Sequence, residues 1–181
     1  MENLQAKYVS AKEILTHCST VTNNEDMHNY IIGKGEIGLP QRLNEINKVL
    51  NGTPFTVSYR VMNELTIYLA VLLDQAEEEG KEITFDSFKQ YVETAIDRIL
   101  LMKILPRVEG DDEMFHISDK ERNANELSDQ AEDGHEFTKL DWLRQIAPQH
   151  NEDNQNEYMA VDKLAEMIER LNRQSFTRFW P

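Results

Sequence analysis

Apolar residues recur every three or four positions along several stretches of the chain, which is the spacing of one face of an α-helix. The strongest such stretches are 39–50, 59–80, 84–105 and 158–174. The stretch at 59–80 has the broadest apolar face, which predicts a central helix that ends at the C-capping glycine Gly80. Pro106 is expected to stop the helix at 84–105, because proline cannot continue a helix without the loss of a backbone hydrogen bond.

Weaker patterns predict shorter elements between these helices. Residues 6–18 and 138–147 have enough amphipathic spacing for short helices, and the polar stretch 19–29 is expected to form a loop. The stretch 53–59, TPFTVSY, is expected to have an extended backbone, because it contains a proline and β-branched residues. It is therefore either a short strand or a straight connector.

The composition changes sharply after Val108. The segment at 109–136 is rich in Asp, Glu, Asn and Ser and poor in large apolar residues. A segment of this kind buries too little surface to offset its ordering entropy, which predicts a mobile acidic insertion. Within it, Met114, Phe115 and Ile117 are the residues able to dock locally.

The C-terminal tail has the opposite composition. The chain ends in SFTRFWP, and Phe176, Phe179 and Trp180 are too apolar to be expected in water. We therefore expect these three side chains to pack back onto the helical core.

These patterns together predict an all-α fold, a small helical bundle in four parts. They are an N-terminal extension with a short helix (1–30), a helical core (31–110), a long acidic, mobile insertion (111–138), and C-terminal helices with the aromatic tail (139–181).

The charge of the chain limits its partners. It has 181 residues, enough for one ordinary domain, and a formal net charge of -14. Phosphates would repel such a surface, so we expect no direct binding of nucleic acid or anionic lipid. No apolar run approaches the roughly 20 residues that span a bilayer, and no signal segment is visible, so we expect a cytoplasmic protein without membrane contact.

Gly33, Gly35 and Gly38 have the spacing GxGxxG of a dinucleotide site. That fingerprint requires a preceding strand and a helix directly after it, within a βαβ unit. Tyr30–Ile32 is barely long enough for a strand, and Pro40 lies where the helix should be under way. A flexible turn is therefore the better interpretation.

The sequence shows no convincing catalytic or metal-binding pattern. His17, His28, His116, His135 and His150 form neither an HExxH motif nor an i,i+4 pair, so we expect no metal site. Cys18 is the only cysteine, and as the neighbour of His17 it does not face that residue on a helix. No GxxxxGK[ST] motif occurs, so we expect no enzyme activity and no cofactor for this chain alone.

Acidic residues are numerous, but nothing in the pattern sets two of them apart as catalytic carboxylates. The run at 77–79 places carboxylates at the C-terminal end of the predicted central helix, where the helix dipole disfavours them. This indicates either a frayed helix end or a nearby cation.

Three stretches, taken in their order along the chain, carry a family resemblance. The first is IIGKGEIGLPQRLNEINKVLNGTPFTVSYRVMNELTIYLAVLL, the second AIDRILLMKILPRVEG and the third KLAEMIERLNRQSFTRFWP. In this order they resemble the C-terminal helical lid of the McrB-type restriction NTPases, a branch of the AAA+ superfamily. The resemblance covers Ile31–Gly110 and Met159–Pro181.

The resemblance implies a nucleotide-sensing role for Arg60, with Ser58 and Tyr59 beside it. In AAA+ proteins the helical lid closes over a nucleotide held by an α/β core and presents a polar residue, often Arg, toward the γ-phosphate. McrB-type members often read Gly-His-Ser-Tyr at this junction, where this chain reads Ser58-Tyr59-Arg60. The alternative for Arg60 is a local role, capping carbonyls or pairing with Glu64 one turn on.

Walker A and Walker B motifs are absent, so the chain looks like a lid from a larger protein or a free-standing relative. The lid hypothesis implies a noncatalytic part of an NTPase in DNA restriction or defence, whose parent binds GTP or ATP with Mg. Its implied partners are the AAA+ core, neighbouring subunits of a ring and a nuclease subunit. The alternative hypothesis is an acidic helical adaptor that binds a basic protein partner through its acidic segment and aromatic tail.

Overall fold

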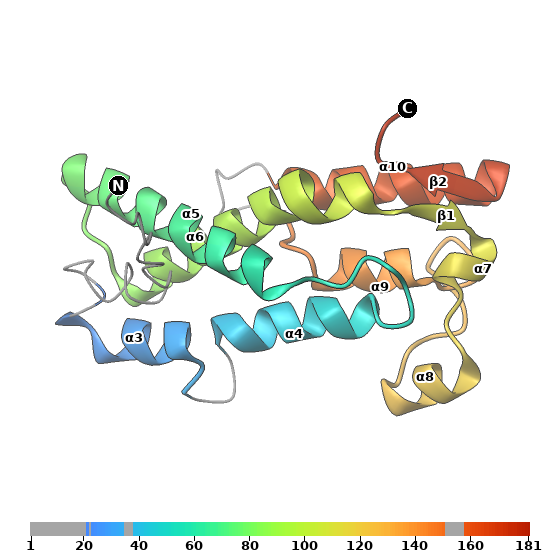
Figure 1. The fold of residues 1–181 in the computed structure, drawn as a ribbon, viewed down its shortest axis with the longest axis horizontal. Helices are drawn as coiled ribbons and strands as arrows, with labels where there is room; N and C mark the ends of the chain where they lie inside the picture. The colour runs from blue at the N-terminus through green and yellow to red at the C-terminus, as the bar shows by residue number, and fades with distance from the viewer. Residues whose placement is uncertain (1–20, 22, 35–37, 151–157) are drawn as a thin grey trace, which may run out of the picture. The chain divides into compact units, whose positions relative to one another are not determined.

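The computed structural model describes residues 21, 23–34, 38–150 and 158–181 (Figure 1). Over these residues the fold is all-α, as predicted, with a small two-stranded sheet. The helix expected at 6–18 lies outside the described residues. The longer helices are α3 (Glu25–Ile32), α4 (Leu39–Val49), α5 (Tyr59–Glu78), α6 (Phe85–Ile99), α9 (Lys139–Ile146) and α10 (Met159–Gln174).

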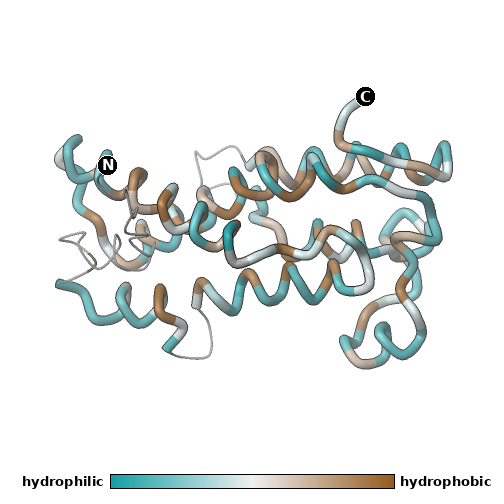
Figure 2. Tube along the Cα trace, in the orientation of Figure 1, coloured by the Kyte–Doolittle hydropathy of each residue, from teal (hydrophilic) through white to brown (hydrophobic). Residues whose placement is uncertain are grey.

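The chain divides into two compact units. The first comprises residues 1–42 and 58–95, and the second residues 43–57 and 96–181. Helices α4 and α6 therefore each contribute residues to both units. Figure 2 shows that hydrophobic positions recur in short patches along the helices, as the periodicity of the sequence predicts.

This division differs from the predicted boundary between a core at 31–110 and the segments after it. Residues 96–110 belong with the C-terminal part of the chain. Asp97 is one residue that links this stretch to α10: it is a buried carboxylate whose Oδ1 accepts a hydrogen bond of 2.7 Å from the backbone N–H of Ala160. Because that N–H lies in the first turn of α10, Asp97 satisfies a donor that the helix itself leaves unpaired.

Helix α3 occupies part of the predicted polar loop at 19–29 and extends the N-terminal part beyond what the apolar pattern indicated. Asn24 caps it, since its side chain accepts hydrogen bonds from the backbone N–H groups of Asp26 and Met27. Gly33 ends it in the left-handed conformation, with φ 71°. Capping and two buried residues therefore outweigh the low apolar content.

The segment before α5 is a connector, and no strand forms there. Asn47 holds it in place: its side chain donates to the carbonyl of Val57 at 3.1 Å and accepts from the N–H of the same residue. Helix α5 then begins at Tyr59 and ends at Glu78, followed by Gly80 with φ 71°, as the pattern predicted.

The acidic end of α5 meets a cation. Lys81 Nζ lies 2.7 Å from Glu79 Oε2. This hydrogen bond lowers the pKa of Glu79, and the carboxylate in turn raises the pKa of Lys81. For the acidic run at 77–79 we expected either a frayed helix end or a nearby cation, and the structure shows the cation.

Helix α6 is regular only as far as Ile99. A π-helical turn follows at Leu100–Ile104, and a 3₁₀ turn at Leu105–Arg107 contains Pro106. Strand β1 (Glu109–Asp111) comes next and pairs antiparallel with β2 (Phe176–Arg178), so that Gly110 lies opposite Thr177. The tail of the chain is thereby joined to the end of this helical stretch.

Residues 111–138 differ from the expected mobile insertion. They contain α7 (Asp112–Phe115) and α8 (Asp119–Ala124), each with a side-chain N-cap, and an isolated bridge between Gln130 and Glu136. Phe115 and Ile117 are fully buried, which confirms the expectation that they dock locally. The segment is ordered by a few buried residues, which a composition average does not reveal.

Arg122 is the second reason for this order. Its guanidinium is 8% exposed and donates to the backbone carbonyls of Ser128, Ile117 and Phe137. It also lies 3.4 Å from a carboxylate oxygen of Asp129. A single buried cation thus satisfies carbonyl groups from three parts of the loop, which would otherwise lose their hydrogen bonds to water.

The C-terminal tail also differs from the expectation. Phe176 is 45% exposed and Trp180 is 64% exposed, and Phe179 is half-buried. Thr177, between them, is the buried residue of β2. Pairing of β2 with β1 fixes the backbone of the tail, and the side chains of Phe176 and Trp180 remain in contact with solvent.

No helix among the described residues combines the length and apolar character needed to cross a bilayer.

Candidate functional site

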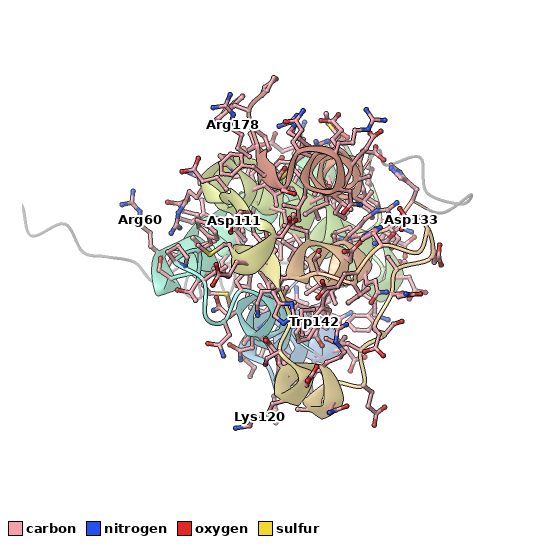
Figure 3. The ribbon with its side chains drawn as sticks, turned by 90° about the vertical axis from the view of Figure 1, so that its right-hand side faces the viewer. Arg60, Asp111, Lys120, Asp133, Trp142 and Arg178 are labelled. Carbon is pink, nitrogen blue, oxygen red and sulfur yellow. The ribbon has the colours of Figure 1, made fainter. Side chains whose placement is uncertain are left out.

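Arg60 lies in the first turn of α5 with its side chain 86% exposed, and Figure 3 shows it projecting away from the ribbon. Its Nε donates to Glu64 Oε1 at 3.1 Å, one helical turn on. The local ion pair weighed in the sequence analysis is therefore present. It uses one of the five N–H donors of the guanidinium, and an exposed i,i+4 pair of this kind contributes only about 0.3–0.5 kcal/mol.

The first turn of α5 has no side-chain cap. Ser58 occupies the N-cap position, but its side chain makes no capping hydrogen bond, and the first turn contains no acidic residue. The structure describes the backbone of Tyr59 but not its side chain. The positive end of a 20-residue helix and an exposed guanidinium thus lie together, an arrangement that favours an anion.

The glycine motif does not form a nucleotide site of the Rossmann type. Helix α3, not a strand, precedes Gly33, which confirms the rejection of that motif. Gly38 has a packing role, since a Cβ atom there would lie 2.7 Å from the carbonyl oxygen of Tyr30. Gly35 lies outside the described residues.

A groove with a volume of about 830 Å³ lies within the second unit, between the 128–137 loop and helices α9 and α10. Its apolar lining includes Phe137 and Ile168, both largely buried. Its carboxylates come from the loop, from α9 and from α10, and two arginines also line it. These charged residues are Glu132, Asp133, Asp141, Glu169, Arg144 and Arg173.

His135 organises one wall of this groove. Its Nε2 lies 3.0 Å from Asp141 Oδ1, and its Nδ1 faces Asp133 Oδ1. The other oxygen of Asp141 accepts hydrogen bonds from the backbone N–H and the hydroxyl of Thr138, which completes a capping box at the start of α9. We expected no metal site at His135 and did not identify its contact with Asp141, although the spacing Thr138-x-x-Asp141 is typical of a capping box.

Among the described residues, His28, His116 and His150 do not gather into a site. His116 contacts Glu136 and His150 contacts Asp162, both at exposed positions, and His17 and Cys18 lie outside the described residues. Within the ranges that the structure describes, no three His, Cys, Asp or Glu side chains could hold a metal ion together.

The tail is held in place by polar contacts. Arg170 Nη1 donates to the carbonyls of Arg178 at 2.7 Å and Trp180 at 3.1 Å. The rings of Phe179 and Trp180 meet edge to face, with centroids 4.7 Å apart. Lys163 Nζ lies 5.0 Å from the centroid of the Phe179 ring. Arg178, labelled in Figure 3, projects outward from β2.

Comparison with known proteins gives one finding. A family model described as a domain of unknown function (DUF8727) matches residues 12–176. It includes the segment at 111–138 that the sequence analysis set apart as an insertion. No curated protein and no solved structure matches the chain.

Proposed function

We propose that this chain, which belongs to the DUF8727 family, is the C-terminal lid and nucleotide-sensing subdomain of a larger McrB-like AAA+ NTPase. In this role it is noncatalytic by itself and serves DNA restriction or defence in the cytoplasm. The exposure of Arg60 at the anion-favouring start of α5 carries the proposal. The resemblance of Ile31–Gly110 and Met159–Pro181 to such lids, with the matching stretches in the same order along the chain, supports it.

The chemistry required of a sensor fits Arg60. A guanidinium stays protonated at every physiological pH and donates two parallel hydrogen bonds to phosphate oxygens. The start of α5 adds a favourable dipole, and the Ser58 hydroxyl is exposed beside it. Glu64 competes with phosphate for the guanidinium, so engagement of the nucleotide requires the exchange of one exposed ion pair for a stronger bidentate one.

The proposal assigns the rest of the machinery to other parts of the parent protein. The AAA+ core holds GTP or ATP with Mg, and neighbouring subunits complete a ring that works with a nuclease. The contribution of this chain is conformational: it closes on the core when the γ-phosphate is present and releases it after hydrolysis.

A second candidate is a free-standing acidic adaptor for a basic protein partner. The exposure of Trp180 favours it, because an exposed indole beside a fixed backbone is typical of an anchor in a protein interface. The reading frame discriminates between the two candidates. A P-loop core encoded directly before Met1 supports the lid, and its absence supports the adaptor.

Arg60→Ala in the complete polypeptide tests the sensor role. Loss of a charge-assisted hydrogen bond costs about 1.5–3 kcal/mol, so we expect NTP turnover to fall by about tenfold or more. Steady-state phosphate release measures it, and circular dichroism checks that the fold is unchanged. Arg107→Ala is the control, because Arg107 is also an exposed arginine and lies outside both the start of α5 and the groove.

Glu64→Gln supplies the opposite perturbation. It removes the charge that competes for Arg60, so a sensing arginine predicts turnover equal to or above that of the parent protein. If Arg60→Ala leaves turnover unchanged, the sensor assignment is wrong, and Arg60 has the local helix-pairing role alone.

A further inference from the structure

The exposed end of the chain is an ordered surface. Trp180 is 64% exposed, yet its carbonyl is bonded to Arg170 and its ring lies against Phe179. Phe176, on the outer face of β2, is 45% exposed. These contacts already restrict the backbone of the tail. The tail therefore loses little conformational entropy when a partner covers the rings of Phe176 and Trp180.

The groove of the second unit has the chemistry to receive such a surface. Beside the buried Phe137 and Ile168, the half-buried Ala131 and Ala165 give the groove an accessible apolar lining for an aromatic ring. The groove volume of about 830 Å³ falls in the range of about 300–1,000 Å³ typical of ligand pockets. Arg144 is exposed in the groove and can lie over an indole face. Its carboxylates, Glu132, Asp133 and Glu169, suit a cationic side chain.

The tail carries that cation. Arg178 projects outward from β2 (Figure 3), and its Nη2 donates to the carbonyl of Pro181 at 2.9 Å. The chain as a whole carries a net charge of -14, so an aromatic segment with an exposed arginine is complementary to much of its own surface. Charge complementarity of this kind selects a partner and orients it.

The tail of a given copy does not fill the groove of that copy. Residues 176–178 pair with β1, and none of residues 176–181 lines the groove. We therefore propose that the tail of one copy, with Trp180 as its anchor and Arg178 beside it, docks into the groove between α9 and α10 of a second copy.

This contact is heterologous, because it joins two different surfaces of the same chain. Copies so joined continue into a ring or an open array. A single aromatic side chain buries about 150–250 Å², well below the roughly 1,200 Å² of a stable interface, so the association of isolated chains is weak and reversible. The contact requires no nucleotide and does not depend on the proposed NTPase role.

Sedimentation velocity of the purified chain at increasing concentration tests the proposal. We expect the sedimentation coefficient of the wild type to rise with concentration. Trp180→Ala removes the anchor, and the double variant Glu132→Lys, Glu169→Lys reverses the charge of the groove. Each is expected to weaken self-association at least tenfold.

A mixture of these two variants is the decisive measurement. One supplies an intact groove and the other an intact tail, so the mixture is expected to form a one-to-one dimer that neither forms alone. Asp74→Lys, Glu78→Lys on the exposed side of α5 is the control, since it makes the same charge change away from the groove. It is expected to associate like the wild type.

A fluorescence measurement places Trp180 directly. In the Trp142→Phe background Trp180 is the remaining tryptophan, and its emission is expected to shift to the blue as the protein associates. The proposal is overturned if the wild type stays monomeric at its solubility limit, if Trp180→Ala associates like the wild type, or if the mixed variants fail to form the dimer.

Discussion

Residues 111–138 and residues 175–181 lie in the same compact unit, and each joins its fold in a different way. The longer segment is polar and acidic, and it is held by Phe115, which is 0% exposed, and by the buried cation of Arg122. The tail is aromatic and is held by backbone pairing to β1 and by Arg170. Its largest side chain, Trp180, stays mostly in solvent.

The difference shows that composition measures the surface a segment has available, not the surface that it buries. A polar segment is fixed when a few side chains find complementary neighbours and satisfy its carbonyl groups. An aromatic segment can remain exposed when backbone hydrogen bonds to a neighbouring strand fix its position, as the pairing of β2 with β1 does here. Exposed aromatic area on an ordered backbone is typical of a binding surface, whereas buried charge is typical of internal support.

The sharpest test of this comparison changes one phenylalanine in each segment. Phe115→Ala removes a fully buried ring, which typically costs about 3–5 kcal/mol of unfolding free energy. Phe176→Ala, its matched control in the tail, removes a ring that is 45% exposed and is expected to cost much less. Urea denaturation of the two variants measures both values. Equal losses would mean that the two segments do not differ in the way described.

Arg122→Ala is expected to have the next largest effect. It leaves the carbonyls of Ser128, Ile117 and Phe137 without their shared donor, and an unsatisfied buried acceptor costs about 1–3 kcal/mol. Limited proteolysis measures the local result: cleavage within 109–136 is expected to be slow in the wild type and fast in the variant. Lys120→Ala is the control, because Lys120 lies on the same helix and points outward (Figure 3).

Rapid cleavage of the wild-type segment at the same sites would restore the hypothesis of a mobile insertion. Equal cleavage rates for Arg122→Ala and the wild type would mean that the caps of α7 and α8 hold the segment without the arginine.

Much of the helical fold was predictable from local patterns. The apolar periodicity indicated α4, α5 and α10, and Gly80 indicated the end of α5. Helix α3 was missed because its order comes from the Asn24 cap and two buried side chains in a polar stretch. The bond between Asp97 and Ala160 joins positions far apart in the chain, so local patterns could not indicate it.

The candidate sites divide in the same way. Arg60 was identified through the family resemblance, which matches it by position at a predicted helix start, and its nucleotide-sensing role stays a prediction. The groove could not be identified from the sequence, because its lining comes from the 128–137 loop, α9 and α10, and only folding brings these together. His135 belongs to the groove through its contact with Asp141, which the sequence analysis did not identify.

Trp180→Ala is expected to have the smallest effect on stability, and the comparison depends most directly on it. The indole is 64% exposed, so its removal in dilute, monomeric protein is expected to change the unfolding free energy by no more than about 0.5 kcal/mol, as for most surface substitutions. Trp142→Ala, which removes the buried tryptophan of α9, shows that the same urea titration detects the loss of a packed indole. A loss of several kcal/mol in Trp180→Ala would mean that the tail is part of the core after all. A negligible loss of stability combined with a loss of self-association would assign Trp180 to an interface, since one substitution would then separate binding from folding.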